Sequence, residues 1–350
     1  MSRMKRSAYT FFLTLIFAGL AGGLFYRFRQ KQITDFAATP FDVGDSKKVD
    51  VLKGTGPKAL AALLRAQGVV SSDSNLYAYI RRENLGPRLK AGEYEFSGAL
   101  TPKEVLDHVV GGQVKTYRFT IPEGLRVEEI LPIIAVSELQ PDLQKLTQLA
   151  ENPAFLKRAQ VPASRVEGFL YPDTYVFTRN TKEEDMLLKM IGRSLEEYRN
   201  ADAVRQQGIT LNLLQTMTLA SIIEKETGQP QERPHISCVF HNRLRLGMKL
   251  QTDPTVLYAM RMLRGVFVKN ITSKDLLTDH PYNTYTRTQL PPGPIANPGS
   301  EAILAALNPS KCDDLFFVSR NDGTHIFCPT LGCHNRAVEQ WQRQYFKKKK

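Results

Sequence analysis

The sequence predicts an α+β protein with a single N-terminal transmembrane helix, a small αβ module after it, and a larger mixed α+β body. Three observations support this prediction. One long uncharged apolar stretch lies near the N-terminus. Hydrophobic residues make up 42% of the 350 residues and charged residues 23%, which is typical of globular proteins. Helical and alternating patterns then follow one another along the rest of the chain.

The apolar stretch over residues 7–26 predicts the membrane anchor. It has no charged residue, and about 20 residues are needed for a helix to cross the hydrocarbon of a bilayer. A cleaved signal peptide is the alternative, but its apolar region usually has only about 7–15 residues. We therefore expect residues 1–32 to form a cytoplasmic tip and a retained anchor. Residues 33–47 are polar and without clear periodicity, and we expect them to be a linker.

The positive charge lies mainly at the two ends of the chain. The formal net charge is +12, but six basic and no acidic residues lie within residues 1–34, and residues 347–350 are all Lys. The remainder is nearly neutral, whereas a nucleic-acid-binding protein needs positive charge on its folded surface. We therefore expect the membrane, and not nucleic acid, as a partner. The part after the anchor is expected to be exported.

Residues 48–115 have the pattern of a small αβ module. The alternation of residues 48–53 and 92–96 predicts strands, and residues 57–67 and 75–82 have helical patterns. Thr101 is a suitable N-cap for a further helix, because Pro102 and Glu104 follow it in the spacing of a capping box. The order strand, helix, helix, strand is that of small glycan-binding LysM modules.

Residues 116–350 are expected to form the mixed α+β body. Asn321-Asp322-Gly323 is a hairpin turn signal between strands at 315–320 and 324–328. Residues 161–180 are rich in Pro, Gly and aromatic residues, which predicts an irregular surface segment. A further strand is expected at 116–121, and helices at 127–135, 143–150, 182–199, 211–227, 301–307 and 335–346.

The four cysteines do not fix a redox state. Cys238, Cys312, Cys328 and Cys333 are an even number, which permits disulfides in an exported domain, while buried free thiols are the alternative. Histidines beside the last two cysteines raise the question of zinc, but the spacing fits no standard zinc site. We expect neither a metal nor a cofactor.

The stretch 213–228, nearly all of it within the predicted helix over 211–227, carries the strongest candidate for chemistry. Apolar residues form one stripe, and Glu226 lies three and four residues after Ile223 and Ile222. Burial beside apolar surface raises the pKa of a carboxyl, and a protonated Glu can act as a general acid. Glu224 lies beside the same stripe. The alternative is that both residues are ordinary charged side chains exposed to solvent at the end of the helix.

Three downstream segments have residues suited to a sugar, which has apolar faces and polar edges. These candidates for substrate binding are Gln251, Thr252, Asp253, Tyr282, Asn283, Thr284, Tyr285 and Asn297. Asn297 belongs to a stiff Pro-rich loop over residues 290–299. Packed structural loops are the alternative interpretation.

Several long motifs together resemble the endolytic murein transglycosylase family, also called MltG or YceG-like proteins. They are LASIIEKETG, HNRLRLGMKLQTDPTVLY and YNTYTRTQLPPGPIANPG, with KAGEYEF, IPEG and EGFLYPDTY before them. The resemblance extends over nearly the whole chain. It implies a body outside the bacterial cytoplasmic membrane, in the periplasm, that cleaves nascent peptidoglycan glycan strands internally. It also implies peptidoglycan synthases (penicillin-binding proteins) as partners.

The resemblance places the catalytic Glu in the EKE segment. We assign it to Glu226, with Glu224 as second choice, and expect cleavage between N-acetylmuramic acid and N-acetylglucosamine to give a 1,6-anhydro end. A lysozyme-like muramidase, with Asp253 activating water, is one alternative. A glycan-binding scaffold without catalysis is another.

Overall fold

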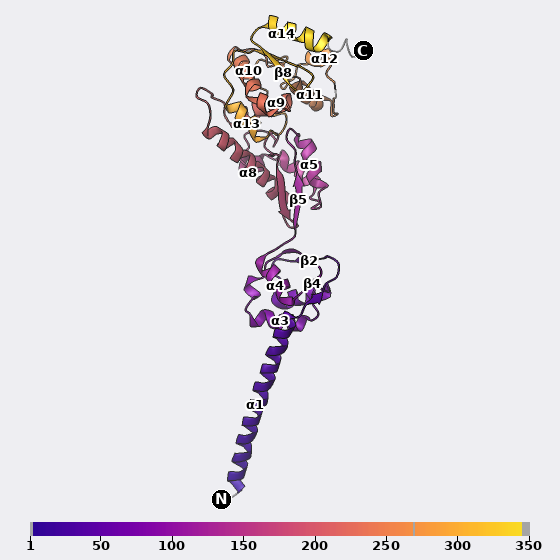
Figure 1. Ribbon diagram of the computed structural model, residues 1–350, viewed down its shortest axis with the longest axis vertical. Helices are drawn as coiled ribbons and strands as arrows, with labels where there is room; N and C mark the ends of the chain where they lie inside the picture. The colour runs from indigo at the N-terminus through magenta and orange to yellow at the C-terminus, as the bar shows by residue number, and fades with distance from the viewer. Residues whose placement is uncertain (1–2, 269, 345–350) are drawn as a thin grey trace. The chain divides into compact units, whose positions relative to one another are not determined.

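The computed structural model describes residues 3–268 and 270–344, and the chain divides into two compact units (Figure 1). Unit 1 comprises residues 1–117 and 178–180, and unit 2 comprises residues 118–177 and 181–350. Helices dominate both units, and the strands of the described residues form two-stranded sheets. The structure therefore confirms a mixed helix and strand protein.

Unit 1 consists of helices packed around two small antiparallel sheets. Strand β2 pairs with β3, with Lys47 opposite Phe96, and β1 pairs with β4. The alternation predicted from the sequence places Val49 and Tyr94 in the core. The elements are α1 (Arg3–Ala38), β1 (Phe41–Asp42), β2 (Lys47–Val51), α2 (Pro57–Ala66), α3 (Asp73–Arg82), η1 (Gly86–Arg88), β3 (Gly92–Phe96), β4 (Ala99–Leu100) and α4 (Pro102–Gly111).

Helix α1 extends further than the sequence predicted. It continues to Ala38, and β1 follows, so the expectation of a linker over residues 33–47 was wrong. Ile33 and Ala37 are each only 4% exposed and pack in the core of unit 1. Together with Phe36 they form an i, i+3, i+4 apolar face, which the intervening polar residues obscure. Arg82 on α3 fixes the same turn by donating to the Thr34 hydroxyl at 2.9 Å.

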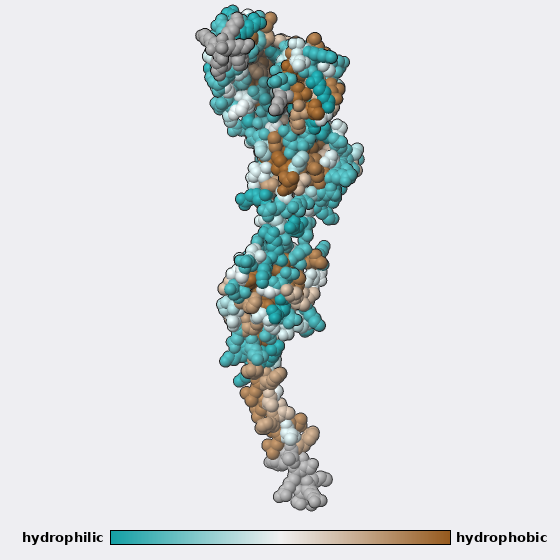
Figure 2. All heavy atoms as spheres, turned by 90° about the vertical axis from the view of Figure 1, so that its right-hand side faces the viewer, coloured by the Kyte–Doolittle hydropathy of each residue, from teal (hydrophilic) through white to brown (hydrophobic). Residues whose placement is uncertain are grey.

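The first part of α1 has large exposed apolar side chains. Phe11 to Phe28 includes aromatic and aliphatic residues that are at least half exposed, visible along α1 in Figure 2. In the described part of the chain, one helix segment, Phe11–Ala38, is long and apolar enough to cross a membrane. This agrees with the expected transmembrane helix by length and composition.

Unit 2 is mainly helical and carries the β7–β8 pair and most of the β5–β6 pair. Strand β5 pairs with β6, and β7 forms an antiparallel hairpin with β8. Its elements are β5 (Thr116–Thr120), α5 (Val127–Ala135), α6 (Leu143–Ala150), α7 (Pro153–Arg158), β6 (Thr174–Thr178), α8 (Glu183–Ala203), α9 (Leu213–Glu226), η2 (Pro230–Glu232), α10 (Arg233–Arg245), α11 (Asp253–Arg264), α12 (Ser273–Leu276), α13 (Ser300–Leu307), β7 (Phe316–Ser319), β8 (His325–Cys328), α14 (Leu331–Val338) and η3 (Glu339–Gln344).

The structure differs from the sequence predictions of unit 2 in three respects. The segment expected to be irregular, 161–180, contains β6, because Tyr175 and Phe177 alternate inward and pack against Phe119. The C-terminal helix begins at Leu331, four residues earlier than expected, and its expected last residues lie outside the described range. Helices α7, α10, α11 and α12 were not predicted.

Helix α9 lies in the core of unit 2, among α10, α11 and α13 (Figure 1). Its residues 216–223 are all buried, so the helix is enclosed around its whole circumference rather than along one stripe. The expectation of an amphipathic helix was therefore wrong. A fully enclosed helix holds its C-terminal residue in a fixed place, which matters for Glu226.

Candidate active site

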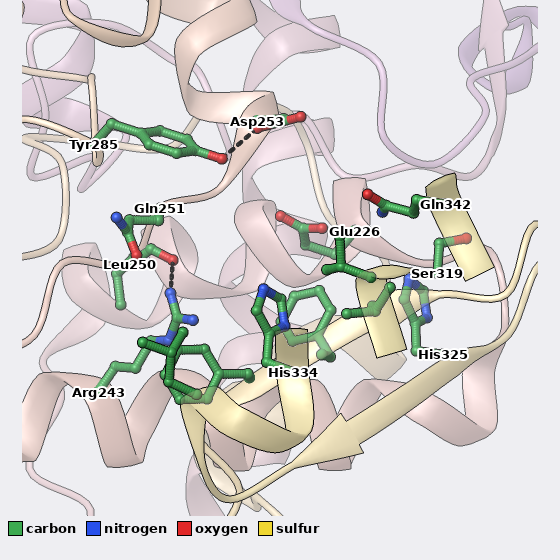
Figure 3. Close-up of a pocket in the computed structure, with 15 residues that line it drawn as sticks. Glu226, Arg243, Leu250, Gln251, Asp253, Tyr285, Ser319, His325, His334 and Gln342 are labelled. Atoms are coloured by element: carbon green, nitrogen blue, oxygen red, sulfur yellow. Dashed lines mark hydrogen bonds between the residues drawn. The ribbon is translucent and has the colours of Figure 1, made fainter. Parts of the chain in front are cut away.

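Glu226 is the last residue of α9 and reaches a pocket of about 490 Å³ (Figure 3). The chain leaves the helix at Thr227, whose backbone is extended. Glu226 is half-buried, so its carboxyl is in contact both with the protein interior and with the pocket. The buried helix behind it holds this carboxyl in place.

The surroundings of Glu226 favour the protonated carboxyl. Burial raises its pKa to about 7, and the negative charge of Asp253 acts in the same direction. The Thr252 hydroxyl, which donates to Glu226 Oε1, and the positive charge of Arg243 lower this pKa. Burial is the largest of these effects. A carboxyl with this pKa is partly protonated at neutral pH and can both give and accept a proton.

Glu224 is engaged in structural contacts instead. Its Oε1 accepts from Arg233 Nη2 at 2.9 Å, and its Oε2 accepts from the Gly299 backbone N–H at 3.0 Å. The side chains of Glu224 and Arg233 are each only 6% exposed. Glu224 does not line the pocket of Glu226. Its contacts connect the end of α9 with the start of α10 and with the Pro-rich loop.

Three of the predicted substrate-binding residues line the pocket together with Glu226: Gln251, Asp253 and Tyr285. The Tyr285 hydroxyl donates to Asp253 Oδ1 at 2.6 Å (Figure 3). Thr252, between the first two, is buried and turned toward Glu226. The structure thus brings together residues from three segments that are separate in the sequence.

The other predicted substrate-binding residues have structural contacts and do not line this pocket. Thr284 is buried, and its hydroxyl accepts from the Thr252 backbone N–H at 3.1 Å. The Asn283 amide donates to backbone carbonyls in the last turn of α12 and directly after it. The Tyr282 ring packs 4.8 Å from that of Tyr258. These three residues shape the loop behind Asp253.

Asn297 is also buried and joins segments far apart in the chain. Its Oδ1 accepts from the Leu170 backbone N–H at 2.8 Å, and its Nδ2 donates to Glu167 Oε1 at 3.1 Å. Gly168, between these two, has a φ of +84°, and a Cβ there would collide with the ring of Pro294. The EGFLYPDTY segment therefore requires glycine for close packing against the Pro-rich loop.

One wall of the pocket comes from residues that were not predicted from the sequence to belong to a site. The hairpin β7–β8 and the following helix supply most of it, and Arg243 lies beneath. These lining residues are Arg243, Phe316, Phe317, Val318, Ser319, His325, Leu331, His334, Val338 and Gln342. The hairpin was predicted, and its adjacent phenylalanines Phe316 and Phe317 indicate an apolar surface. Nothing in the sequence shows that this surface lies opposite the end of α9.

Arg243 joins the two sides of the pocket. Its Nε donates to the Leu315 carbonyl at 2.6 Å, at the start of the hairpin. Its Nη1 donates to the Leu250 carbonyl at 2.7 Å, directly before Gln251 (Figure 3). The guanidinium also lies over the Phe316 ring, 5.2 Å from its centroid. A fixed planar fork of donors is suited to holding two backbone segments at once.

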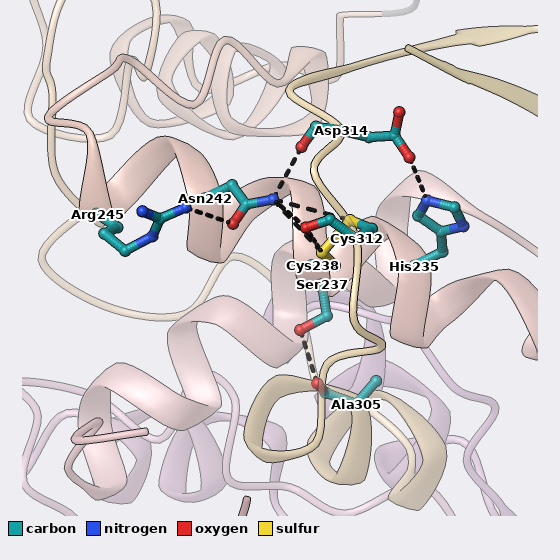
Figure 4. Close-up of a disulfide and its surroundings, with 8 residues drawn as sticks. All are labelled: His235, Ser237, Cys238, Asn242, Arg245, Ala305, Cys312 and Asp314. Carbon is teal, nitrogen blue, oxygen red and sulfur yellow. Dashed lines mark hydrogen bonds and ion pairs between the residues drawn. A yellow bond between two sulfur atoms is a disulfide. The ribbon is translucent and has the colours of Figure 1, made fainter. Parts of the chain in front are cut away.

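All four cysteines are paired, as Cys238–Cys312 (Figure 4) and Cys328–Cys333. Within residues 3–268 and 270–344, one group has the arrangement of a metal site, formed by His235, Cys312 and Asp314. Cys312 is occupied by its disulfide, and His235 Nε2 is paired with Asp314 at 2.8 Å. Each of these residues already has a partner, and they do not form a ready set of ligands.

Comparison with known proteins identifies the family. The profile of the YceG-like family matches residues 49–340. A protein of Bacillus subtilis strain 168 named endolytic murein transglycosylase is 31% identical over 321 residues, which cover 85% of this chain and 86% of that protein. A protein of the same name from Streptococcus pneumoniae D39 is 28% identical over 335 residues, or 86% of this chain and 60% of its own length.

A solved structure agrees with these relatives. The crystal structure of a YceG-like protein from Listeria monocytogenes is 30% identical and has a TM-score of 0.55. The alignment covers 84% of this chain and 99% of that chain. The family match, the relatives and the fold confirm the resemblance seen in the motifs. This chain belongs to the YceG-like family.

Proposed function

We propose that this chain is an endolytic murein lytic transglycosylase that cleaves glycan strands between N-acetylmuramic acid and N-acetylglucosamine. The observation that carries the proposal is Glu226, a carboxyl with a pKa of about 7 at the edge of a pocket of about 490 Å³. The names of the relatives from Bacillus subtilis and Streptococcus pneumoniae support the same reaction. Gln251, Asp253 and Tyr285 line the pocket with polar groups and a ring suited to sugars.

The reaction requires one carboxyl to transfer a proton twice. Protonated Glu226 gives its proton to the glycosidic oxygen, and the bond from that oxygen to C1 of N-acetylmuramic acid breaks. The carboxylate then takes the proton of the 6-hydroxyl of the same sugar while that oxygen bonds to C1. The products are a free 4-hydroxyl on one fragment and a 1,6-anhydro ring on the other. No water is consumed, and Glu226 regains its proton.

The neighbours of Glu226 support this double role. Asp253 raises its pKa, so the proton is available for the first step. The Thr252 hydroxyl donates to Oε1 and favours the carboxylate needed in the second step. A pKa near the working pH suits a group that acts first as an acid and then as a base. A second catalytic carboxylate is not required, in contrast to most glycoside hydrolases.

We also propose that α1 anchors the protein in the bacterial cytoplasmic membrane. In this arrangement the N-terminus is cytoplasmic and unit 2 is in the periplasm. The apolar helix segment Phe11–Ala38 supports the anchor, and the two disulfides suit an oxidising compartment. Nascent glycan strands and the synthases that make them would then be partners at the membrane surface. Unit 1 would bind or orient the strand, as a LysM-like module does.

Product analysis distinguishes this reaction from its two alternatives. Full-length protein in detergent is incubated with purified glycan strands, and the fragments are examined by mass spectrometry. Lytic cleavage leaves an anhydro end without added water, whereas hydrolysis with Asp253 activating water adds one water to the end. A glycan-binding scaffold yields no fragments. Only the first result agrees with the proposal.

A further inference from the structure

His334 lies on α14 and lines the same pocket as Glu226 (Figure 3). Its ring packs 5.1 Å from that of Phe316. Its Nδ1 is buried and has no hydrogen-bond partner among the residues that the structure describes. Because Nδ1 is shielded, Nε2 is the ring nitrogen that can serve a ligand in the pocket.

The surroundings of His334 determine which nitrogen carries the proton. Burial lowers its pKa, and the positive charge of Arg243 lowers it further, so the ring is neutral at neutral pH. A neutral imidazole has one N–H donor and one acceptor nitrogen. Among backbone groups a buried N–H without a partner is rarer than an under-satisfied carbonyl, and we extend this rule to the imidazole ring. We therefore assign the proton to Nε2, which makes His334 a hydrogen-bond donor toward the pocket.

A disulfide fixes the chain immediately before His334. Cys328 ends β8 and Cys333 lies in the first turn of α14, with a sequence separation of 5. Thr330 caps the same helix, and its hydroxyl accepts from the Cys333 backbone N–H at 3.3 Å. The hairpin wall and α14 are therefore joined covalently at the residue next to His334.

We propose that His334 is a substrate-binding residue of this pocket, held in position by the Cys328–Cys333 disulfide. Its Nε2–H donates to a neutral acceptor oxygen of the glycan, of the kind that an acetamido carbonyl supplies. The two cysteines are positioning residues, since they act through His334. This inference rests on the proposed function, because it takes the glycan strand as the ligand of the pocket.

The first test measures KM and kcat of the full-length protein on purified glycan strands. An interaction made equally in the bound and transition states raises KM when it is lost and leaves kcat unchanged. His334→Ala should raise KM about 5- to 10-fold, the effect of one neutral hydrogen bond, with kcat nearly unchanged. Arg336→Ala, an exposed position on the same helix, is the matched control and should leave both constants unchanged. An unchanged KM for His334→Ala would overturn the proposal.

Two conservative variants keep the test decisive if the alanine variant does not fold. His334→Gln carries an amide that reaches about as far as Nε2, whereas the amide of His334→Asn is one bond shorter. We expect KM to stay near the parental value for Gln and to rise for Asn. An equal KM for Gln and Asn would contradict donation from Nε2.

A double-mutant cycle tests the positioning role of the disulfide. Cys328→Ser with Cys333→Ser should raise KM in the parent, but by clearly less in the His334→Ala background. Purely additive effects would show that the disulfide stabilises the fold without positioning His334. Thermal unfolding of each variant identifies losses caused by misfolding.

A further experiment distinguishes failure of the proposed function from failure of the inference about His334. If the parental protein does not cleave the strands, retention of glycan by Glu226→Gln is compared with retention by Glu226→Gln, His334→Ala. Weaker retention by the double variant supports His334 as a binding residue even without catalysis. Equal retention overturns this inference as well.

Discussion

Glu226 and Glu224 are two residues apart, and burial raises the pKa of both carboxyls, but their contacts differ. Glu226 faces a pocket and has one hydroxyl partner, Thr252. Glu224 is held by a guanidinium and by a backbone N–H, and it is away from that pocket. The sequence placed both beside one apolar stripe. The two carboxyls can be told apart only in the folded structure, where α10 and the Pro-rich loop bind Glu224 and leave Glu226 facing the pocket.

The raised pKa of Glu226 predicts a pH dependence of the rate. Its first role requires the protonated carboxyl, and the fraction of that form in the free enzyme decreases as the pH rises through about 7. We therefore expect kcat/KM on glycan strands to fall on the alkaline side of about pH 7. The measurement is a pH–rate profile from mildly acidic to mildly alkaline buffers. A rate that stays constant or increases across that range would contradict the role of Glu226 as the acid.

Replacement of Glu224 should reduce stability more than catalysis. Glu224→Gln removes the charge that faces Arg233, whose remaining partners Glu123 and Glu301 are about half exposed. We expect a loss of about 1–3 kcal/mol in the free energy of unfolding, as is usual for a weakened buried polar contact. Urea unfolding measures this loss. An unchanged unfolding midpoint would show that Glu224 does not stabilise the end of α9.

At the scale of the elements, the pocket is formed by segments that are remote in sequence. The end of α9, the start of α11 and the hairpin β7–β8 meet there, connected through Arg243. The sequence predicted α9 and the hairpin, because helical spacing and the Asn-Asp-Gly turn are local signals. It could not predict that they face one another, since long-range packing leaves no periodic pattern. For the same reason His334 was considered only as a neighbour of cysteines.

The polar loop residues show a second limit of sequence reasoning. Asn283 and Asn297 have amides suited to binding sugars, yet both are buried and bind backbone groups. A buried amide that bonds to carbonyls is indistinguishable in sequence from one that binds a ligand. Asp253 and Tyr285, by contrast, face the pocket. Burial, which depends on the assembled core, decides between the two outcomes.

Glu167 holds the EGFLYPDTY segment against the Pro-rich loop and predicts a pH dependence of stability. It is 2% exposed, and burial raises its pKa to about 7, while Arg165, Arg126 and a hydrogen bond from the Tyr258 hydroxyl lower it. The folded state therefore binds more protons than the unfolded state between the ordinary pKa of 4.5 and about 7. Glu167 therefore contributes most favourably to folding below pH 4.5, and the free energy of unfolding decreases as the pH rises from 4.5 to about 7.

The test compares unfolding of the parent and of Glu167→Gln across that pH window. The variant retains an oxygen that can accept from the Val127 backbone N–H and the Asn297 amide, but it does not titrate. The free energy of unfolding of Glu167→Gln relative to the parent should increase from below pH 4.5 to about 7. A difference that is independent of pH would show that Glu167 is charged in the folded state.

For the whole molecule, α1 divides into two parts with different surroundings. Its first part exposes apolar residues, and its last turns pack into unit 1 through Ile33 and Ala37. The polar residues that follow the apolar stretch predicted a linker, whereas Ile33 and Ala37 among them pack in the core of unit 1. Because α1 continues directly into a folded core, its apolar part is connected to unit 1 without a flexible segment.

Two truncations test this division of α1. Removal of residues 1–28 should release a soluble protein with unit 1 folded, because the packed turns remain. Removal of residues 1–38 also deletes Ile33, whose burial alone contributes about 1.5–3 kcal/mol. We expect the longer truncation to lower the free energy of unfolding of unit 1, measured by denaturant unfolding. Equal stability of the two truncated proteins would restore the linker interpretation. Membrane association of the protein that lacks residues 1–28 would contradict the anchor.

The most direct test of Glu226 as the acid and base compares the rates at which Glu226→Gln and Glu224→Gln form anhydro ends. The amide in Glu226→Gln keeps the size and hydrogen bonding of the protonated acid but has no proton to transfer. We predict a loss of at least about 10²–10⁴-fold in rate with glycan retention unchanged, since general acid–base catalysis typically contributes that much. Glu224→Gln should retain most of the parental rate. Anhydro ends formed by Glu226→Gln at near the parental rate, or a loss confined to Glu224→Gln, would contradict Glu226 as the acid and base of this enzyme.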